Sequence, residues 1–156
     1  MSLESVRQHL AETAPDLTVL VTEASSATVE LAAAAHGVAP GQIAKTLSFR
    51  LKDDVFLLVT RGDVRLDNKK AKAVFGGKVK MLGREEVEEL TGHPVGGVCP
   101  FGLATPLKVY LDESLKTFSE VIPAAGAINA AVRVDPIRMA EITGGLWVDV
   151  CQPPTA

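Results

Sequence analysis

Two strand-like runs separated by three residues constrain the fold of this chain more than any other feature of its sequence. Residues 44–51 (AKTLSFRL) and 55–62 (VFLLVTRG) carry the apolar and β-branched side chains that pleated strands favour, and Lys52, Asp53 and Asp54 lie between them. A connection this short joins antiparallel neighbours, because parallel strands require a longer crossover. The two runs therefore predict a β-hairpin.

Helices and strands are interleaved along the rest of the 156 residues without a strict βαβ order. Capping residues, apolar runs and glycine stops predict helices over residues 2–12, 28–36, 68–75, 84–90 and 136–143, and strands over residues 17–23, 78–82, 107–113, 130–135 and 146–150. A chain of this length buries one hydrophobic core. We predict a single α/β (α+β mixed) domain over residues 1–156, with a mixed, mostly antiparallel sheet flanked by helices.

Composition and terminal sequence argue against several classes of protein. No apolar run approaches the roughly 20 residues of a membrane-spanning helix, and the first 15 residues lack the apolar core of a signal peptide. We therefore expect a cytoplasmic location and no membrane partner. Cys99 and Cys151 have neither a C-x-x-C partner nor metal-ligand spacing, so we expect no metal site and no disulfide.

Positive charge is concentrated in one part of the chain. Residues 45–84 hold 11 of the 16 Lys and Arg residues but only 4 of the 19 Asp and Glu residues, although the chain has a net charge of −3. Clustered lysines usually form a solvated surface, yet those of residues 61–80 lie in the same positive half as Lys45. This placement favours a polyanion as a partner.

Lys45 lies where a glycine-led turn enters the first strand of the hairpin. A desolvated ammonium is costly unless an anion or a carbonyl meets it, although a lysine at a strand end can also extend into solvent. The loop GGVCPFG, residues 96–102, has glycines whose amides can approach a ligand closely. Cys99 within it is an alternative nucleophile, but no motif links it to a histidine base. Lys45 and this loop form the candidate site, with a cysteine-dependent amidase as an alternative.

Six short segments, in their order and spacing, resemble the YbaK/EbsC (ProX-like) family of aminoacyl-tRNA deacylases, which includes relatives of the prolyl-tRNA synthetase editing domain. They are QIAKTL, LVTRGDVRLDNKKAK, ELTGHPVGGVCPFGL, VYLDESL, AAGAIN and EITGGLWVDV. The resemblance extends from about Thr28 to Val150. It implies a YbaK-like editing domain and a hydrolase without cofactors that deacylates mischarged tRNA.

The resemblance also implies roles for particular residues. Lys45 is expected to be catalytic and to lie near the 3′-terminal adenosine or the ester of the bound aminoacyl-tRNA. The segment from Gly96 to Pro100 is expected to be a G-x-x-x-P substrate loop. The expected substrate-binding residues are Gly96, Gly97, Val98, Cys99, Pro100, Gly126 and Asn129. The expected tRNA-binding residues are Arg61, Arg65, Lys69, Lys70 and Lys72.

The identity of the substrate stays open at this point. In the family, the attacking group comes from water or from a hydroxyl or side chain of the substrate itself, so no protein nucleophile is required. Residues 124–132 (AAGAINAAV) differ from the corresponding stretch of some relatives and leave Ala, Cys, Ser and Thr as candidates, on tRNA(Pro) or a related tRNA. The need for a synthetase partner and the oligomeric state also stay open. A non-catalytic module that binds tRNA ends or aminoacyl-adenosine is the alternative.

Overall fold

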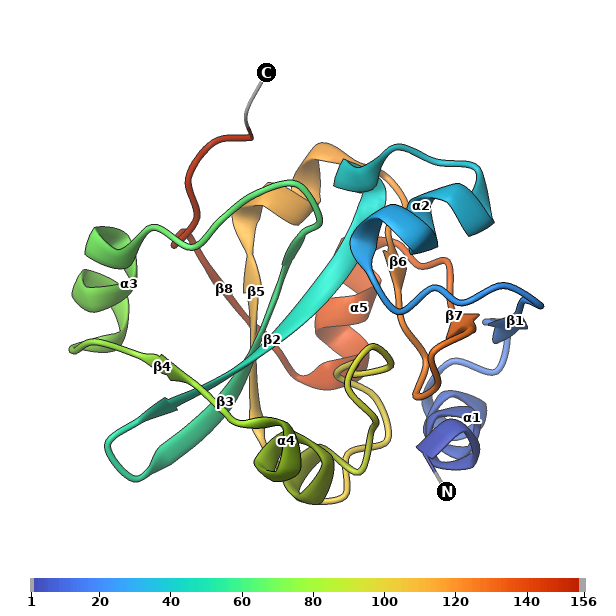
Figure 1. The fold of residues 1–156 in the computed structure, drawn as a ribbon, viewed down its shortest axis with the longest axis horizontal. Coiled ribbons are helices and arrows are strands. Elements are labelled where there is room, and N and C mark those ends of the chain that lie inside the picture. Colours follow the sequence, from blue (N-terminus) through green and yellow to red (C-terminus); the bar gives the residue numbers. More distant parts are fainter. Residues whose placement is uncertain (1, 155–156) are drawn as a thin grey trace.

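The predicted hairpin lies at the centre of the computed structural model, which describes residues 2–154 (Figure 1). Strands β2 (Ile43–Leu51) and β3 (Asp54–Arg61) pair antiparallel from Ala44 opposite Arg61 to Leu51 opposite Asp54. Lys52 adopts a positive φ of 55° in the turn. Residues 57–59 of β3 are completely buried, which makes the hairpin the framework around which the other elements pack.

Four further strands extend this hairpin into a six-stranded sheet with the order β4-β2-β3-β5-β8, in which β6 also pairs with β2. They are β4 (Lys80–Met81), β5 (Lys108–Asp112), β6 (Ile122–Pro123) and β8 (Leu146–Val148). The predicted mixed sheet is confirmed, but the expectation of mostly antiparallel pairing is corrected. Within residues 2–154, β2 pairs antiparallel with β3 and β4, whereas β6, β5 and β8 join the sheet in parallel. Helix-containing crossovers lead into β5 and β8, and such crossovers allow parallel pairing.

The five predicted helices are all present, and their ends follow the capping signals in the sequence. They are α1 (Ser2–Thr13), α2 (Val29–His36), α3 (Asn68–Phe75), α4 (Arg84–Thr91) and α5 (Pro136–Thr143). Side-chain oxygens of Thr28, Asp67 and Asp135 accept hydrogen bonds from the first amides of α2, α3 and α5. Local sequence therefore determines where these helices begin.

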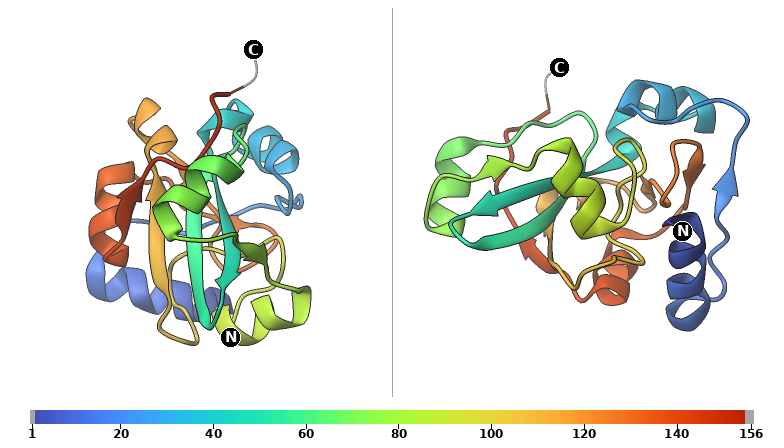
Figure 2. Two further views of the ribbon diagram at one scale, coloured as in Figure 1. Left: turned by 90° about the vertical axis from the view of Figure 1, so that its left-hand side faces the viewer. Right: turned by 60° about the horizontal axis from the view of Figure 1, so that its bottom comes forward.

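Helices cover both faces of the sheet. Side chains of α1 and α5 pack with Leu57, Val59 and Leu111 on one face, and these two helices lie together beside the sheet (Figure 2). On the other face, α3 and residues 150–151 pack against Phe56 and Leu58. The alternation of side chains along β3 and β5 produces this division into two apolar clusters.

Two predicted strands are much shorter than expected. Residues 17–23 and 130–135 contribute only β1 (Leu20–Val21) and β7 (Ala130–Ala131), which pair with each other in a separate ladder. Val21 is half exposed, whereas Ala130 and Ala131 are buried, so only the β7 side of this ladder joins the core. No helix within residues 2–154 is long and apolar enough to cross a membrane.

Candidate functional site

The candidate site lies at a break in the pairing of β2. One edge of β2 is covered by β3 from Ala44 to Leu51. On the other edge, β6 pairs at Ile43 and Ala44 and β4 pairs at Phe49 and Arg50, toward opposite ends of the strand (Figure 1). Among the described residues, no strand pairs with this edge between these two ladders. This edge of β2 is thereby open to a ligand over residues 45–47.

Polar groups of Thr46 face this break. In an antiparallel ladder, successive residues direct their main-chain groups to alternate neighbours. The carbonyl of Ser48 accepts a hydrogen bond from the amide of Leu82, on the side of β4. The amide and carbonyl of Thr46, two residues earlier, therefore point toward the same edge. Thr46 Oγ1 is also buried, and no group within residues 2–154 makes a hydrogen bond to it.

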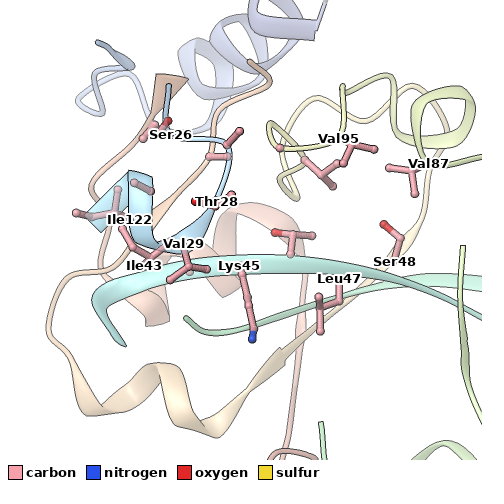
Figure 3. A pocket seen from close by; sticks show the side chains of 18 of the residues that line it. Ser26, Thr28, Val29, Ile43, Lys45, Leu47, Ser48, Val87, Val95 and Ile122 are labelled. Carbon is pink, nitrogen blue, oxygen red and sulfur yellow. The ribbon is translucent and has the colours of Figure 1, made fainter. Parts of the chain in front are cut away.

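A cavity of about 270 Å³ opens at the break (Figure 3). Its walls come from β2, the start of α2, α4, β6 and the loop that follows α4. Most of its lining is aliphatic or small, and its polar side chains are mainly hydroxyls. The lining includes Ser26, Ala27, Thr28, Val29, Ile43, Lys45, Thr46, Leu47, Ser48, Val87, Val95, Gly96, Val98, Ile122 and Ala124. Such a pocket suits a small, largely apolar group carried by a polar ester.

The predicted substrate loop borders this cavity, and close packing explains its glycines. Gly96 has a φ of 94°, and a Cβ atom there would lie 2.9 Å from the Cβ atom of Ala27. A Cβ atom on Gly97 would lie 2.7 Å from the amide nitrogen of Ala127. Both distances are shorter than normal van der Waals contact. The loop is therefore held between the segments that contain Ala27 and Ala127.

The amide groups of this loop are used unequally. Gly97 donates to the carbonyl of Pro94 at 2.8 Å, and Gly126 donates to the carbonyl of Gly97 at 2.9 Å. The amides of Gly96 and Val98 donate no hydrogen bond to another group within residues 2–154. Both residues line the cavity. Their N–H groups are thus the donors that the loop has available for a ligand.

Lys45 connects the cavity to the opposite face of β2. The side chain leaves the strand on the side opposite Ser48, Val87 and Val95 (Figure 3). Its Nζ donates a hydrogen bond of 2.6 Å to the carbonyl of Val64, on the face of the sheet covered by α3. Burial lowers the pKa of the Lys45 ammonium, while the charges of Cys151 and Asp63 act in the opposite direction. The Lys45 amine therefore belongs to a residue at the break in β2, but it already has the Val64 carbonyl as a hydrogen-bond partner.

Cys99 lies behind the loop and not in the cavity. Its side chain is completely buried in the core beside Phe101. Burial raises the pKa of the thiol to about 12. His93 Nε2 lies 3.6 Å from Cys99 Sγ but 2.7 Å from the carbonyl of Phe101, to which it is hydrogen-bonded. A neutral, enclosed thiol is a poor nucleophile, so the geometry does not support the cysteine-dependent amidase.

The other residues expected to bind substrate support the loop from behind. Pro100 and Gly126 are buried, and a Cβ atom on Gly126 would lie 2.8 Å from the carbonyl oxygen of Ser2. Asn129 Nδ2 donates a hydrogen bond of 2.9 Å to the carbonyl of Thr22. Of the seven residues expected to bind substrate, Gly96 and Val98 line the cavity. The others remain predictions, and the contacts above are structural.

The predicted tRNA-binding residues fall into two groups. Arg61 forms an ion pair with Asp63, donates to Thr117 Oγ1 and stacks over the ring of Phe118, so its side chain is engaged within the protein. The remaining side chains are exposed on or beside α3, which covers the same face of the sheet as the Lys45 amine. They are Arg65, Lys69, Lys70 and Lys72, of which Lys70 contacts Asp149 and the carbonyl of Cys151.

Reasoning from the sequence missed the hydroxyl groups in the cavity. Ser26, Thr46 and Ser48 line it, yet none of them was assigned a role from the sequence, although Thr46 lies within QIAKTL. The signal that could have found two of them is the pair of polar residues inside the strand-like run TLSF. A central strand is buried on both faces, so hydroxyls within it require partners.

A family model for the aminoacyl-tRNA editing domain matches residues 23–142 of this chain. The matched region includes all of β2 and β3, the loop from Gly96 to Pro100 and the basic residues of α3. The match therefore covers the whole candidate site.

Similar proteins extend the likeness along almost the whole chain. The Bacillus subtilis protein YwhH is 49% identical over 154 residues, which are 97% of this chain and 98% of that protein. The Enterococcus faecalis protein named "Putative Cys-tRNA(Pro)/Cys-tRNA(Cys) deacylase EbsC" is 32% identical over 123 residues, covering 78% of this chain and 75% of EbsC. A solved structure described as "a putative trans-editing enzyme for prolyl tRNA synthetase" has a TM-score of 0.90 and 37% identity, and covers 97% of this chain and 98% of its own.

Proposed function

This chain belongs to the aminoacyl-tRNA editing domain family, and on that premise we propose that it is a deacylase of mischarged tRNA. The observation that carries the proposal is the cavity at the break in β2. There the lysine-bearing strand and the Gly96–Val98 loop border one space that is open to a ligand.

The available groups suit hydrolysis of an ester that is already activated. Water attacks the carbonyl carbon, a tetrahedral oxyanion forms, and the C–O bond to the terminal ribose breaks. The amino acid leaves as a carboxylic acid, and the ribose hydroxyl recovers a proton. Within residues 2–154, the amides of Gly96 and Val98 donate to no other group, and the Thr46 amide points to the unpaired edge of β2, so all three can stabilise the developing oxyanion. Positioning and such donors supply the larger part of catalysis for a substrate of this kind.

In this proposal, Lys45 binds the terminal nucleotide to which the amino acid is esterified. Its amine lies on the α3 face, together with Arg65, Lys69 and Lys72. The tRNA end therefore approaches along this positive face, and the aminoacyl group passes through the break in β2 into the cavity. A phosphate or ribose oxygen then replaces the Val64 carbonyl as the partner of Lys45 Nζ, which fixes the ester in place.

The names of two similar proteins support a small amino acid on tRNA(Pro) as the substrate. EbsC is named for deacylation of Cys-tRNA(Pro) and Cys-tRNA(Cys), and the solved structure is described as a trans-editing enzyme for prolyl-tRNA synthetase. We extend both to this chain as a proposal. We also propose that the protein acts in the cytoplasm and that a synthetase delivers the tRNA to it.

The test is deacylation of tRNA(Pro), tRNA(Ala) and tRNA(Thr) charged with Ala, Cys, Ser, Thr or Pro. We expect one or two esters to be hydrolysed well above the spontaneous rate. Lys45→Ala should lower kcat/KM at least about 100-fold, as expected when a positioning charge is lost, while changing stability by roughly 1–3 kcal/mol through the lost hydrogen bond to Val64. Lys108→Ala, which removes an exposed lysine that does not line the cavity, should keep wild-type rates. Unfolding of the Lys45→Ala protein would contradict the assigned role.

A binding module without turnover is the second candidate, and one observation favours it. Lys45 Nζ already donates to the Val64 carbonyl, as expected of a lysine with a structural role. This candidate predicts that tRNA binds while every ester survives at its spontaneous rate. The same panel therefore separates the two functions.

A further inference from the structure

Ser48 is a buried hydroxyl in a place where the strand calls for an apolar side chain. Its side chain lies on the same face of the sheet as Leu57, its cross-strand partner, which is completely buried in the principal core. Ser48 itself is only 5% exposed. A buried hydroxyl costs free energy unless it is hydrogen-bonded.

The Ser48 hydroxyl has no such bond in the part of the chain that the structure describes. Among residues 2–154, no side-chain hydrogen bond uses it, whereas the Ser26 hydroxyl donates to the carbonyl of Ile128. Ser48 lines the cavity and points to the side where Val87 and Val95 lie (Figure 3). Thr46 Oγ1, on the same face of β2, also lacks a partner within the described residues. Within the described residues, Thr46 therefore has an enclosed hydroxyl without a partner, and Ser48 presents an unpaired hydroxyl to a cavity whose other walls are mainly aliphatic.

We infer that Ser48 is a specificity-determining residue whose hydroxyl hydrogen-bonds the side-chain hydroxyl of the substrate's amino acid, with Thr46 as a second hydroxyl on the same face. The inference rests on the proposed function, because it places the aminoacyl group in this cavity. It assigns a seryl or threonyl ester, in preference to alanyl, as the substrate class. A substrate that lacks the hydroxyl leaves Ser48 without this partner and loses the contribution of one hydrogen bond.

The experiment measures binding as well as turnover, so that it does not depend on catalysis. The ligands are 3′-amide analogues, seryl- and alanyl-amino-deoxyadenosine, which cannot be hydrolysed at an ester bond. Calorimetry gives their Kd values for the wild type, Ser48→Ala and Ser26→Ala. Deacylation of Ser-tRNA and Ala-tRNA is measured in parallel. Ser26→Ala is the matched control, since it removes a lining hydroxyl that already has a protein partner.

We expect the wild type to bind the seryl analogue about tenfold more tightly than the alanyl analogue, as one hydrogen bond in an enclosed site predicts. Ser48→Ala should bring that ratio near one by weakening only the seryl analogue. Its melting temperature should not fall, because the hydroxyl has no partner among residues 2–154. Ser26→Ala should leave the ratio unchanged.

Three results would overturn the inference: a ratio near one in the wild type, a ratio unchanged in Ser48→Ala, or an equal loss for both analogues. The last would assign the hydroxyl to the α-amino group or the ribose, which both analogues share. If the binding ratio holds but no ester is hydrolysed, the proposed function fails while the assignment of Ser48 stands.

Discussion

At the scale of single residues, the orientation of Cys99 decides between two kinds of chemistry. The thiol is completely buried, and its pKa is raised to about 12. We predict that Cys99→Ala keeps kcat/KM within about twofold of wild type and lowers stability by roughly 1–2 kcal/mol, the usual cost of a small cavity in a core. Deacylation kinetics and thermal unfolding measure the two effects. Inactivation of the folded enzyme by iodoacetamide at Cys99 would restore the nucleophile hypothesis.

Lys45 could be selected as a candidate from the sequence because a charge beside an apolar run is unusual whatever the fold, and its role stays a prediction. The surroundings of Cys99 and Asn129 were not identifiable in this way. Ser2, at the start of the N-terminal helix, packs closely against Gly126. The Asn129 side chain donates a hydrogen bond to the carbonyl of Thr22, more than 100 residues away. Contacts between such distant segments decide which side of a loop faces a cavity, and no local pattern encodes them.

At the scale of elements, the loop after α4 depends on glycine for its position. A Cβ atom at Gly97 would lie 2.7–2.9 Å from three backbone atoms of Ala127, whereas one at Gly83 would meet nothing within 4 Å. We predict that Gly97→Ala costs roughly 1–3 kcal/mol of stability, as overpacking does, and lowers kcat/KM at least about tenfold by displacing Gly96 and Val98. Gly83→Ala is the control and should change neither quantity by much. Wild-type kinetics in Gly97→Ala would show that the loop is not part of the site.

The sequence predicted helices better than short strands. Thr28, Asp67 and Asp135 cap their helices by local hydrogen bonds, so the sequence alone locates those helix starts. Strands β1 and β7 exist only because they meet each other, and their apolar runs extend beyond the two paired residues of each. The break in β2 was likewise hidden, since it results from where β4 and β6 happen to end.

At the scale of the whole molecule, the positive segment predicts how tRNA binding depends on salt. Lys69 and Lys72 are exposed on α3, and both can reach phosphates. We predict that replacing both by Ala makes the slope of log Kd against log salt concentration shallower by about two, close to one for each lost phosphate contact. Arg7→Ala, on α1, is the control and should keep the wild-type slope. An unchanged slope in the double variant would place the tRNA on another surface.

The uneven distribution of charge along the chain is evident in the sequence, but the role of each charged residue is not. Arg61 belongs to the positive segment, yet Asp63, Thr117 and Phe118 hold its side chain. Composition therefore indicates a positive surface, and only tertiary contacts show which of its charges are available to a partner.

The central claim is that the aminoacyl ester binds at the break in β2, and amide NMR tests it most directly. The measurement titrates the ¹⁵N-labelled protein with seryl-amino-deoxyadenosine and follows each backbone amide resonance. We predict the largest shifts at Thr46, Gly96 and Val98, with smaller shifts at Val64 as Lys45 changes its partner. A separate pocket is lined by Phe56, Phe75 and Tyr110. Shifts confined to that pocket would contradict the account.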